Sequence, residues 1–141
     1  MNNQEKTIKF FKELSFENID SVNNFYHPKC DFIDPLTKIS GIEEIKNYYK
    51  NLYKSVNSIR FEFTDFISEK EKLAAYWTMY LSAKGIKNGQ EISVAGCSHI
   101  KFENNLAIYH RDYYDMGEFV YEHISILNKI IFYIKRRLKS K

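Results

Sequence analysis

The stretch GCSHIKFENNLAIYHRDYYD, residues 96–115, decides the fold of this chain. Apolar and polar side chains alternate on either side of Asn104-Asn105, and a period of two indicates β-strands. Asparagine tolerates the positive φ angles of a tight turn, so this pair predicts a hairpin between two strands. The stretch therefore predicts the last two strands of an antiparallel meander.

Two segments before this hairpin show the same period. SIRFEFTDFIS (58–68) places Ile59, Phe61 and Phe63 on one face, whereas LAAYWTMYLSA (73–83) is apolar on both faces. A strand that is apolar on both faces is expected to be covered on both sides. Asn88-Gly89 is typical of the turn that would connect the second strand to the hairpin. A shorter strand is expected earlier in the chain, at CDFID.

Helices precede the meander. Residues 3–14 and 42–56 repeat apolar side chains at helical spacing, and a second short helix is expected between Ser15 and His27-Pro28. Helices followed by a run of hairpins predict an α+β fold, in which a curved, mostly antiparallel sheet wraps around N-terminal helices. A chain of 141 residues without an internal linker predicts one such domain over residues 1–118.

Composition is that of a globular chain, because 44% of the residues are hydrophobic and 16% are aromatic. Cys30 and Cys97 show neither metal-ligand spacing nor a disulfide pattern, so we expect two free thiols in a cytoplasmic protein. The N-terminal residues do not resemble a signal peptide, and no apolar run has the length of a membrane span. The sequence predicts neither a metal nor an organic cofactor.

Charge is unevenly distributed along the chain. Residues 119–141 contain six Lys and Arg and one Glu, a net charge of +5, which leaves −2 of the formal +3 for residues 1–118. The mildly acidic body disfavours nucleic-acid binding. The tail repeats apolar residues every three or four positions and predicts a basic amphipathic helix packed on the same domain. Packing against a second subunit and a weak contact with a membrane surface are the alternatives.

Asp34 occupies an unusual position in FIDPLTKISG (32–41), where a carboxylate precedes a proline at the end of an apolar run. In one interpretation it shapes a turn by accepting hydrogen bonds from nearby backbone N–H groups. In the other it lines a pocket, where a partly desolvated carboxylate can act as a general base.

His110, Asp112 and Tyr114 share one face of the last predicted strand because they alternate along it. A histidine two residues from an aspartate on one face can share a proton with it, which suits general acid–base chemistry. A buried polar pair that only satisfies its own hydrogen bonds is the alternative. Trp77, the single tryptophan, is expected in the core or in the wall of a pocket.

The order of elements, together with FYHPKCDFIDP and GCSHIKFENNLAIYHRDYYD, resembles the SnoaL-like branch of the nuclear transport factor 2-like superfamily. That superfamily includes ketosteroid isomerase and polyketide cyclases. The resemblance covers residues 4–138 and implies an α+β cone, in which a strongly curved sheet closes around helices and leaves a pocket open at one end. It does not by itself imply one activity, because the family hosts enzymes and non-enzymes.

Several site positions are implied by this resemblance. Asp34-Pro35 is similar to the Asp-Pro pair that holds the general base of ketosteroid isomerases. Tyr26 and Tyr49 match two pocket tyrosines of that family. Asp112 resembles an aspartate that polyketide cyclases carry on the same strand.

The oxyanion hole of the isomerases is not matched. Phe10 stands where that family has a tyrosine, and Ser98 stands near the position of a protonated aspartate. Each lost donor costs about 3–4 kcal/mol of transition-state stabilisation, so ketosteroid isomerisation is not expected. His99, next to Ser98, should point to the opposite face of the sheet.

These patterns predict a homodimer whose apolar pocket holds a small hydrophobic molecule. Its chemistry would be an acid–base isomerisation, cyclisation or hydration without a cofactor, carried by Asp34, His110 and Asp112. The pocket would be lined by Tyr26, Tyr49, Trp77, Ser98 and Tyr114. The alternative is a non-catalytic module of the same fold that binds a ligand or a partner protein.

Overall fold

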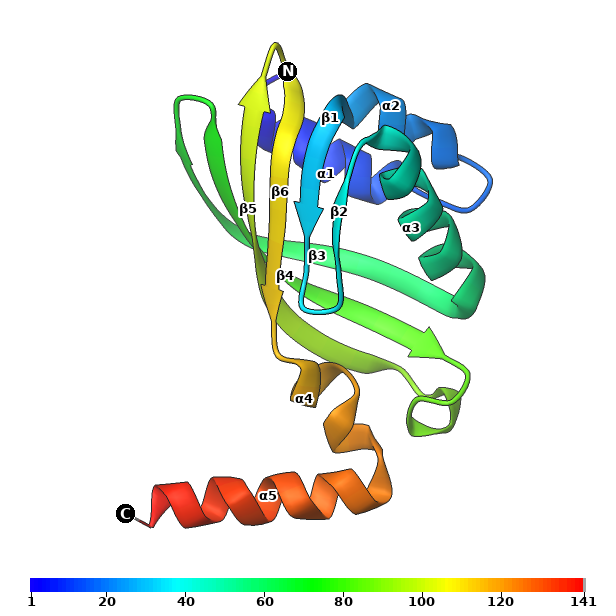
Figure 1. Cartoon of the computed structure of the whole chain (residues 1–141), viewed down its shortest axis with the longest axis vertical. Coiled ribbons are helices and arrows are strands. Elements are labelled where there is room, and N and C mark those ends of the chain that lie inside the picture. Colours follow the sequence, from blue (N-terminus) through cyan, green and yellow to red (C-terminus); the bar gives the residue numbers. More distant parts are fainter. Residues whose placement is uncertain (141) are drawn as a thin grey trace.

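The computed structural model describes residues 1–140 as an α+β protein built on one six-stranded sheet (Figure 1). The strands are β1 (Tyr26–Ile33), β2 (Lys38–Ser40), β3 (Val56–Glu69), β4 (Lys72–Ala83), β5 (Ile92–Glu103) and β6 (Leu106–Tyr114). Their order is β2-β1-β6-β5-β4-β3, and all neighbours are antiparallel except β1 and β6, which are parallel. The sheet is strongly curved and does not close, so its concave side forms the interior of a cone.

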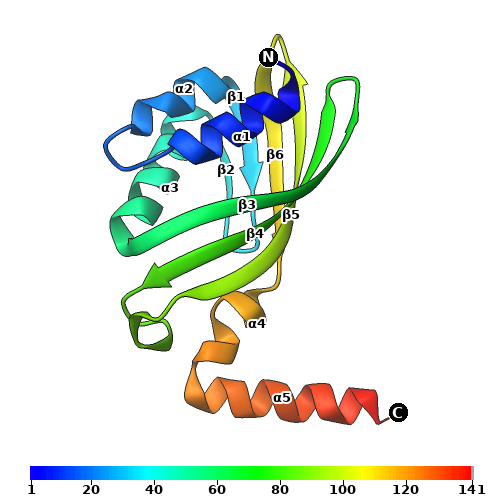
Figure 2. The same cartoon turned by 180° about the vertical axis from the view of Figure 1, so that it is seen from behind.

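Helices cover the concave side of the sheet (Figure 2). They are α1 (Asn3–Glu13), the 3-10 turn η1 (Ile19–Ser21), α2 (Val22–Phe25) and α3 (Ile42–Ser55). α1 begins at a capping box, in which Asn2 and Glu5 each accept a hydrogen bond from the backbone N–H of the other. The predicted α+β fold, with a curved sheet around N-terminal helices, is confirmed.

The hairpin predicted from residues 96–115 is present as β5 and β6. Asn104 and Asn105 have φ angles of +50° and +67°, the left-handed conformation that a tight hairpin turn requires. A further short turn, η2 (Lys87–Gly89), connects β4 to β5 where the sequence predicted it. The β5–β6 register shifts between Lys101 and Phe102, and beyond this irregularity Ser98 lies directly opposite Asp112.

Two features of the sheet were missed by the sequence prediction. β1 begins at Tyr26, before the expected CDFID strand, and pairs in parallel with β6. β2 forms an edge strand within the expected loop. The β1–β6 pairing joins segments far apart in sequence, so local periodicity carries no information about it. It matters for the interior because it places Phe32 beside His110.

The core lies between the helices and the concave face. In its larger cluster, the rings of Phe10 and Phe25 stack with centroids 4.3 Å apart, and Phe10 meets Tyr26 edge-on at 5.5 Å. A second cluster consists of Trp77, Met79, Leu81, Ile92 and Val94. Phe63 packs against both clusters and joins them. Truncating a buried ring of this kind to alanine typically costs about 3–5 kcal/mol.

The C-terminal segment leaves the body of the fold. It forms α4 (Met116–Phe119), η3 (Tyr121–His123) and α5 (Ser125–Lys139), and Figures 1 and 2 show α5 projecting from the sheet. No side chain of α5 is buried, and the helix contacts the rest of the chain mainly through η3. Residues 119–140, where the sequence predicted one basic amphipathic helix, thus comprise the end of α4, the turn η3 and the helix α5. None of the helices within residues 1–140 is long and apolar enough to cross a membrane.

Candidate active site

His110 and Asp112 lie side by side on the concave face of β6. The imidazole Nε2 is 2.6 Å from Asp112 Oδ1. The His110 side chain is completely buried, whereas 16% of the Asp112 side chain remains exposed. Alternation along the strand accounts for their shared face. The pair therefore connects the interior of the cone to a surface that a ligand can reach.

Tyr26 and Tyr49 extend this pair into the core. The Tyr26 hydroxyl lies 2.6 Å from His110 Nδ1 and 2.8 Å from the Tyr49 hydroxyl. Burial raises the pKa of both phenols well above the ordinary range, so both stay protonated. Each phenol then has one hydrogen to donate, which is satisfied when Tyr49 donates to Tyr26 and Tyr26 donates to His110.

This order of donors determines where the imidazole proton lies. With Nδ1 accepting from Tyr26, His110 carries its hydrogen on Nε2 and donates it to Asp112 Oδ1. If Nδ1 carried a hydrogen instead, Tyr26 would accept it and donate to Tyr49, and the Tyr49 hydroxyl hydrogen would lose its acceptor in this chain. In this arrangement each ring nitrogen of His110 has one hydrogen-bond partner.

Ser98 and Trp77 hold the same carboxylate from the neighbouring strands. Ser98 Oγ donates to Asp112 Oδ1 over 2.5 Å, and the Trp77 indole N–H donates to Ser98 Oγ over 2.8 Å. The sheet register makes this chain possible because it pairs Ser98 with Asp112 and Trp77 with Gly96. A Cβ atom at Gly96 would come within 2.2 Å of the Trp77 ring, so this position has no room for a side chain.

Asp112 is consequently engaged through one oxygen only. Oδ1 accepts from both His110 and Ser98, whereas Oδ2 accepts no hydrogen bond within residues 1–140. The side chain lines two adjoining cavities. A carboxylate oriented by two fixed donors, with its second oxygen unengaged, can accept a proton from a bound molecule.

Asp34 is held differently. Its Oδ1 accepts from the N–H groups of Leu36 and Thr37, each over 2.8 Å, and its Oδ2 accepts from the Tyr48 hydroxyl over 2.5 Å. Asp34 is buried and also lines an open cleft, so the geometry contains both of the roles that the sequence suggested. Because three donors already occupy its oxygens, the carboxylate is less available as a base than that of Asp112.

Tyr48 was missed by the sequence prediction, which selected only its neighbour Tyr49. Burial, and then the carboxylate of Asp34, raise the pKa of Tyr48. Its phenol therefore remains a donor to Asp34 and ties α3 to the β1–β2 loop. The available signal was the pair Tyr48-Tyr49 itself, since adjacent helical residues point in different directions and can serve two neighbouring groups.

Two cavities meet at Tyr114. An inner cavity of about 60 Å³ lies among aromatic side chains, and an open cleft of about 410 Å³ lies beside Asp34 and Pro35. Asp112 and Tyr114 line both. Burial, followed by the carboxylates of Asp34 and Asp112, raises the pKa of Tyr114. The inner cavity has room for only a few water molecules, so a larger ligand must occupy the cleft or displace Tyr114.

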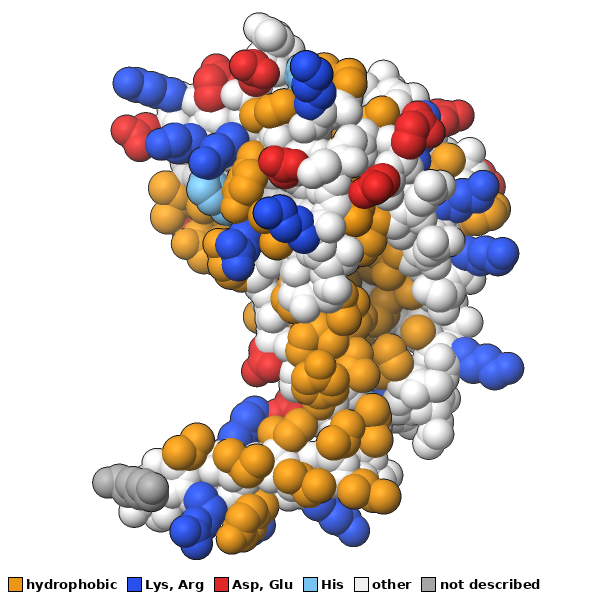
Figure 3. Space-filling model, viewed as in Figure 1, with side chains coloured by type: hydrophobic (Ala, Val, Ile, Leu, Met, Phe, Trp, Pro, Cys, Tyr) orange, Lys and Arg blue, Asp and Glu red, His pale blue; other side chains and the backbone are white. Residues whose placement is uncertain are grey.

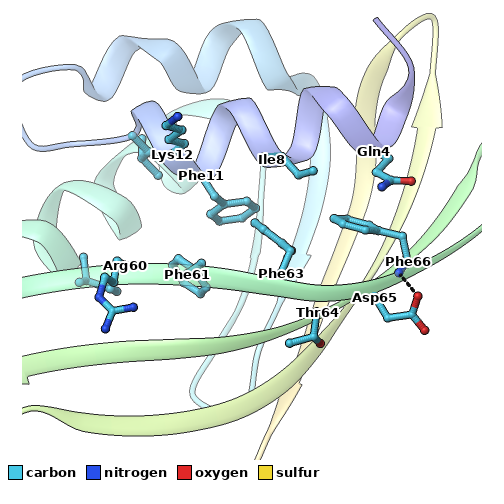
Figure 4. Close-up of a pocket in the computed structure, with 12 residues that line it drawn as sticks. Gln4, Ile8, Phe11, Lys12, Arg60, Phe61, Phe63, Thr64, Asp65 and Phe66 are labelled. Carbon is cyan, nitrogen blue, oxygen red and sulfur yellow. Dashed lines mark hydrogen bonds between the residues drawn. The ribbon is translucent and has the colours of Figure 1, made fainter.

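A larger groove lies outside this network, between α1 and β3 (Figure 4). Its volume is about 760 Å³, and Ile8 and Phe11 face Phe61 and Phe63 across it. Phe11 and Phe61 also line the inner cavity, and their ring centroids are 5.1 Å apart. These two rings therefore separate the groove from the interior. None of the predicted site residues lines the groove.

Other polar residues lie away from the site. His99 is on the opposite face from Ser98, as predicted, with its ring 5.5 Å from that of Tyr109. Burial lowers the pKa of His99, and the charges of Lys101 and Lys72 lower it further. Within the described residues, no group of three or more His, Cys, Asp or Glu side chains is placed to hold a metal ion.

The curved sheet around helices is a nuclear transport factor 2-like fold. The SnoaL-like domain model matches residues 8–110, more than half of the sequence, and the chain therefore belongs to the SnoaL-like domain family. This confirms the resemblance seen in the sequence. A search of curated protein sequences found no match.

Solved structures show the same fold at low identity. An NTF2-like protein of unknown function from Burkholderia pseudomallei K96243 is 17% identical with a TM-score of 0.74, covering 84% of this chain and 95% of its own. A proposed SnoaL-like polyketide cyclase from Jannaschia sp. CCS1 is 16% identical with a TM-score of 0.75, covering 87% and 91%. TerC co-crystallised with polyporic acid is 14% identical with a TM-score of 0.72, covering 83% and 94%. At these identities the likeness establishes the fold alone.

Proposed function

We propose that the protein binds a small hydrophobic molecule where the cleft meets the inner cavity, and that Asp112 acts on it as a general base in isomerase- or cyclase-like chemistry. The observation that carries this proposal is the one-sided engagement of Asp112. His110 and Ser98 hold Oδ1, which leaves Oδ2 without a hydrogen bond within residues 1–140 in a side chain that lines both cavities. Fixed donors of this kind keep a base in one orientation and so lower the cost of reaching the transition state.

The proposed reaction begins when Asp112 Oδ2 takes a proton from a carbon or oxygen atom of the ligand. The bond from that atom to hydrogen breaks, an O–H bond forms on Asp112, and the electron pair stays on the ligand. Return of the proton to another ligand atom completes an isomerisation. Attack of the electron pair on a carbonyl carbon of the same ligand closes a ring instead, with the proton passing to the new alkoxide.

Tyr114 is the candidate donor for the negative charge that forms on the ligand. It lines both cavities, and its raised pKa keeps the hydroxyl protonated. Phe10 occupies the position of the oxyanion tyrosine of ketosteroid isomerases, but it has no hydroxyl and is buried against Phe25. Asp34 remains a proposed second acid–base residue, although its three donors favour a role in holding the loop and Tyr48 at the rim.

A non-catalytic binding module is the second candidate. The small volume of the inner cavity, which the chain's own aromatic rings largely fill, favours it. The co-crystal of TerC with polyporic acid supports ligand binding by this fold in general. In this case the chain from Tyr49 to Asp112 would recognise a polar group of the ligand without transferring its proton.

Native mass spectrometry of protein purified from its own host tests both candidates, because a bound molecule appears as added mass. With that molecule as substrate, Asp112→Asn should retain binding and lower turnover by about 10²–10⁴-fold. Glu103→Gln, an exposed carboxylate at the end of β5, is the matched control and should change neither. Binding without conversion would favour the module, and unchanged turnover in Asp112→Asn would contradict the assignment of the base.

We also propose a two-fold homodimer through the convex face of the sheet. Tyr76, Cys97 and Tyr113 lie in one row across β4, β5 and β6. Tyr76 is 39% exposed and Tyr113 is 49% exposed. An exposed aromatic row of this kind suits an isologous contact, in which each subunit buries the same surface. A cytoplasmic location remains a proposal that the two free cysteines support.

A further inference from the structure

α5 carries an exposed apolar stripe, and none of its side chains is buried within residues 1–140. Its aliphatic side chains recur every three or four residues, at Ile126, Leu127, Ile130, Ile131, Ile134 and Leu138. Five of these six are at least 40% exposed. Apolar surface of this extent is unfavourable in water, so a partner surface is expected to cover it.

Outside the stripe, α5 carries the exposed rings of Phe132 and Tyr133 together with basic side chains. It contains five Lys and Arg and no acidic residue. Lys135 pairs with Glu122 of η3, and within residues 1–140 the other four basic side chains form no ion pair. Lys135 lies one turn after Ile131 of the stripe, and Lys129 lies one turn before Tyr133, an exposed aromatic residue outside the stripe. Such long side chains can rest their methylenes on an apolar layer and extend their charges to its polar surface.

We propose that α5 lies flat on an anionic lipid bilayer. The stripe would enter the boundary between head groups and acyl chains, and the lysines and arginines would contact the anionic head groups. With about 1.5 Å per residue, the helix of 15 residues is about 22 Å long, which is shorter than the hydrocarbon core of about 30 Å. The helix therefore lies in the plane of the surface.

The charge of α5 favours an anionic bilayer over a second α5 helix or a nucleic acid as the surface that covers the stripe. A second α5 would bring five like charges against five without an acidic residue between them. A nucleic acid would neutralise the basic side chains but leave the aliphatic stripe in water. An anionic bilayer satisfies both parts of the helix at once.

The position of α5 relative to the cone also bears on how a ligand would reach the interior. Figure 3 shows hydrophobic side chains continuing from the hollow of the body towards α5. Leu36 and Phe119 of α4 line the inner cavity on this side. A membrane-bound α5 would hold the opening of the cone near the lipid, where hydrophobic molecules concentrate. This consequence rests on the proposed function, whereas the membrane contact itself does not.

Vesicle co-sedimentation of the full chain tests the proposal. We expect binding to phosphatidylcholine vesicles that contain about a third phosphatidylglycerol, weak binding to phosphatidylcholine alone, and a loss of binding between about 0.05 and 0.5 M NaCl. Lys129→Glu/Arg136→Glu should weaken binding by about 10-fold or more. Ile130→Ser/Ile134→Ser should weaken it as well, because the stripe loses apolar area.

Lys50→Glu/Lys54→Glu on α3 is the matched control, since it changes the net charge equally at exposed positions of the body. Equal loss of binding in this variant would mean diffuse attraction and would overturn the proposal. Failure of the wild-type chain to bind anionic vesicles would overturn it too. If Ile130→Ser/Ile134→Ser instead converts a dimer into a monomer, or lowers the melting temperature of the domain, protein covers the stripe and the proposal is wrong.

Discussion

The ring of Trp77 occupies the space that a side chain at Gly96 would need, since an added Cβ atom would stand 2.2 Å from Cη2. The two residues face each other across β4 and β5. This close packing aims the indole N–H at Ser98, which in turn holds Asp112. A glycine far from any turn therefore supports the carboxylate of the candidate active site.

Gly96→Ala should accordingly displace Trp77 and destabilise the domain by about 1–3 kcal/mol. Urea denaturation followed by circular dichroism would measure the loss, and tryptophan fluorescence would report the moved ring. Trp77→Phe is the partner variant, because a smaller ring removes the clash. The double variant should lose less stability than the two single losses combined, and strict additivity would show that the clash does not occur.

Replacing each carboxylate of the site by an amide should lower folding stability by different amounts. Asp34→Asn should cost about 1–2 kcal/mol of folding stability, because three hydrogen bonds to a charged acceptor become neutral ones. Asp112→Asn should cost less, because its Oδ2 makes no hydrogen bond within the described chain. Chemical denaturation of both variants measures the difference. A larger loss for Asp112→Asn would contradict the one-sided engagement of that carboxylate.

Alkaline pH should unfold the domain through its buried tyrosines. Burial raises the pKa of Tyr26, Tyr48 and Tyr49 above the ordinary value of about 10. Above that pH the unfolded chain has released these protons while the folded chain still binds them, so stability falls as pH rises. Each phenol contributes up to about 1.4 kcal/mol per pH unit, and below about pH 9 the three contribute no pH dependence.

Urea denaturation at several pH values between about 8 and 11 would measure this slope. Tyr48→Phe removes one buried phenol and should make the alkaline slope shallower. Tyr133→Phe, on exposed α5, is the control and should leave the slope unchanged. Constant stability up to about pH 11 would show that the phenols are not buried as described.

The proposed dimer should dissociate when its aromatic row is charged. Light scattering of the wild-type chain at micromolar concentration should give the mass of two chains. Tyr76→Glu/Tyr113→Glu should give a monomer, because two carboxylates would be buried in each subunit's half of the interface. Phe16→Glu, another exposed aromatic position, should remain dimeric. A monomeric wild-type chain would refute the dimer.

Local sequence rules determined the inner face of the site. The Asn104-Asn105 turn closes the β5–β6 hairpin, and a register shift between Lys101 and Phe102 follows it. Beyond this irregularity Ser98 pairs with Asp112, and alternation places His110 and Asp112 on one face. Both rules act over a few residues, through backbone sterics and the two-residue period of a strand. For this reason the shared face of His110, Asp112 and Tyr114 could be predicted from the sequence, whereas the family resemblance supplied the expectation that this face is the inner one.

Only the tertiary structure determined which side chains from other elements contact that face. The parallel pairing of β1 with β6 and the packing of α3 bring Tyr26 and Tyr49 to His110. These contacts join segments distant along the chain, and the family resemblance indicated the two tyrosines without their hydrogen-bond partners. In the turn at Asp34, two backbone N–H groups donate hydrogen bonds to its carboxylate. Asp34 is therefore less available as a base, and Asp112 is the stronger candidate.

The C-terminal helix shows the same division. Its three- to four-residue apolar repeat and basic residues were sufficient to predict an amphipathic helix, because both properties depend on side chains within one segment. Where the helix begins and what it touches depend on the chain leaving β6 through α4 and η3, which direct α5 away from the sheet. Sequence periodicity describes the face that a helix must bury, and only the three-dimensional path of the chain determines which surface is within its reach.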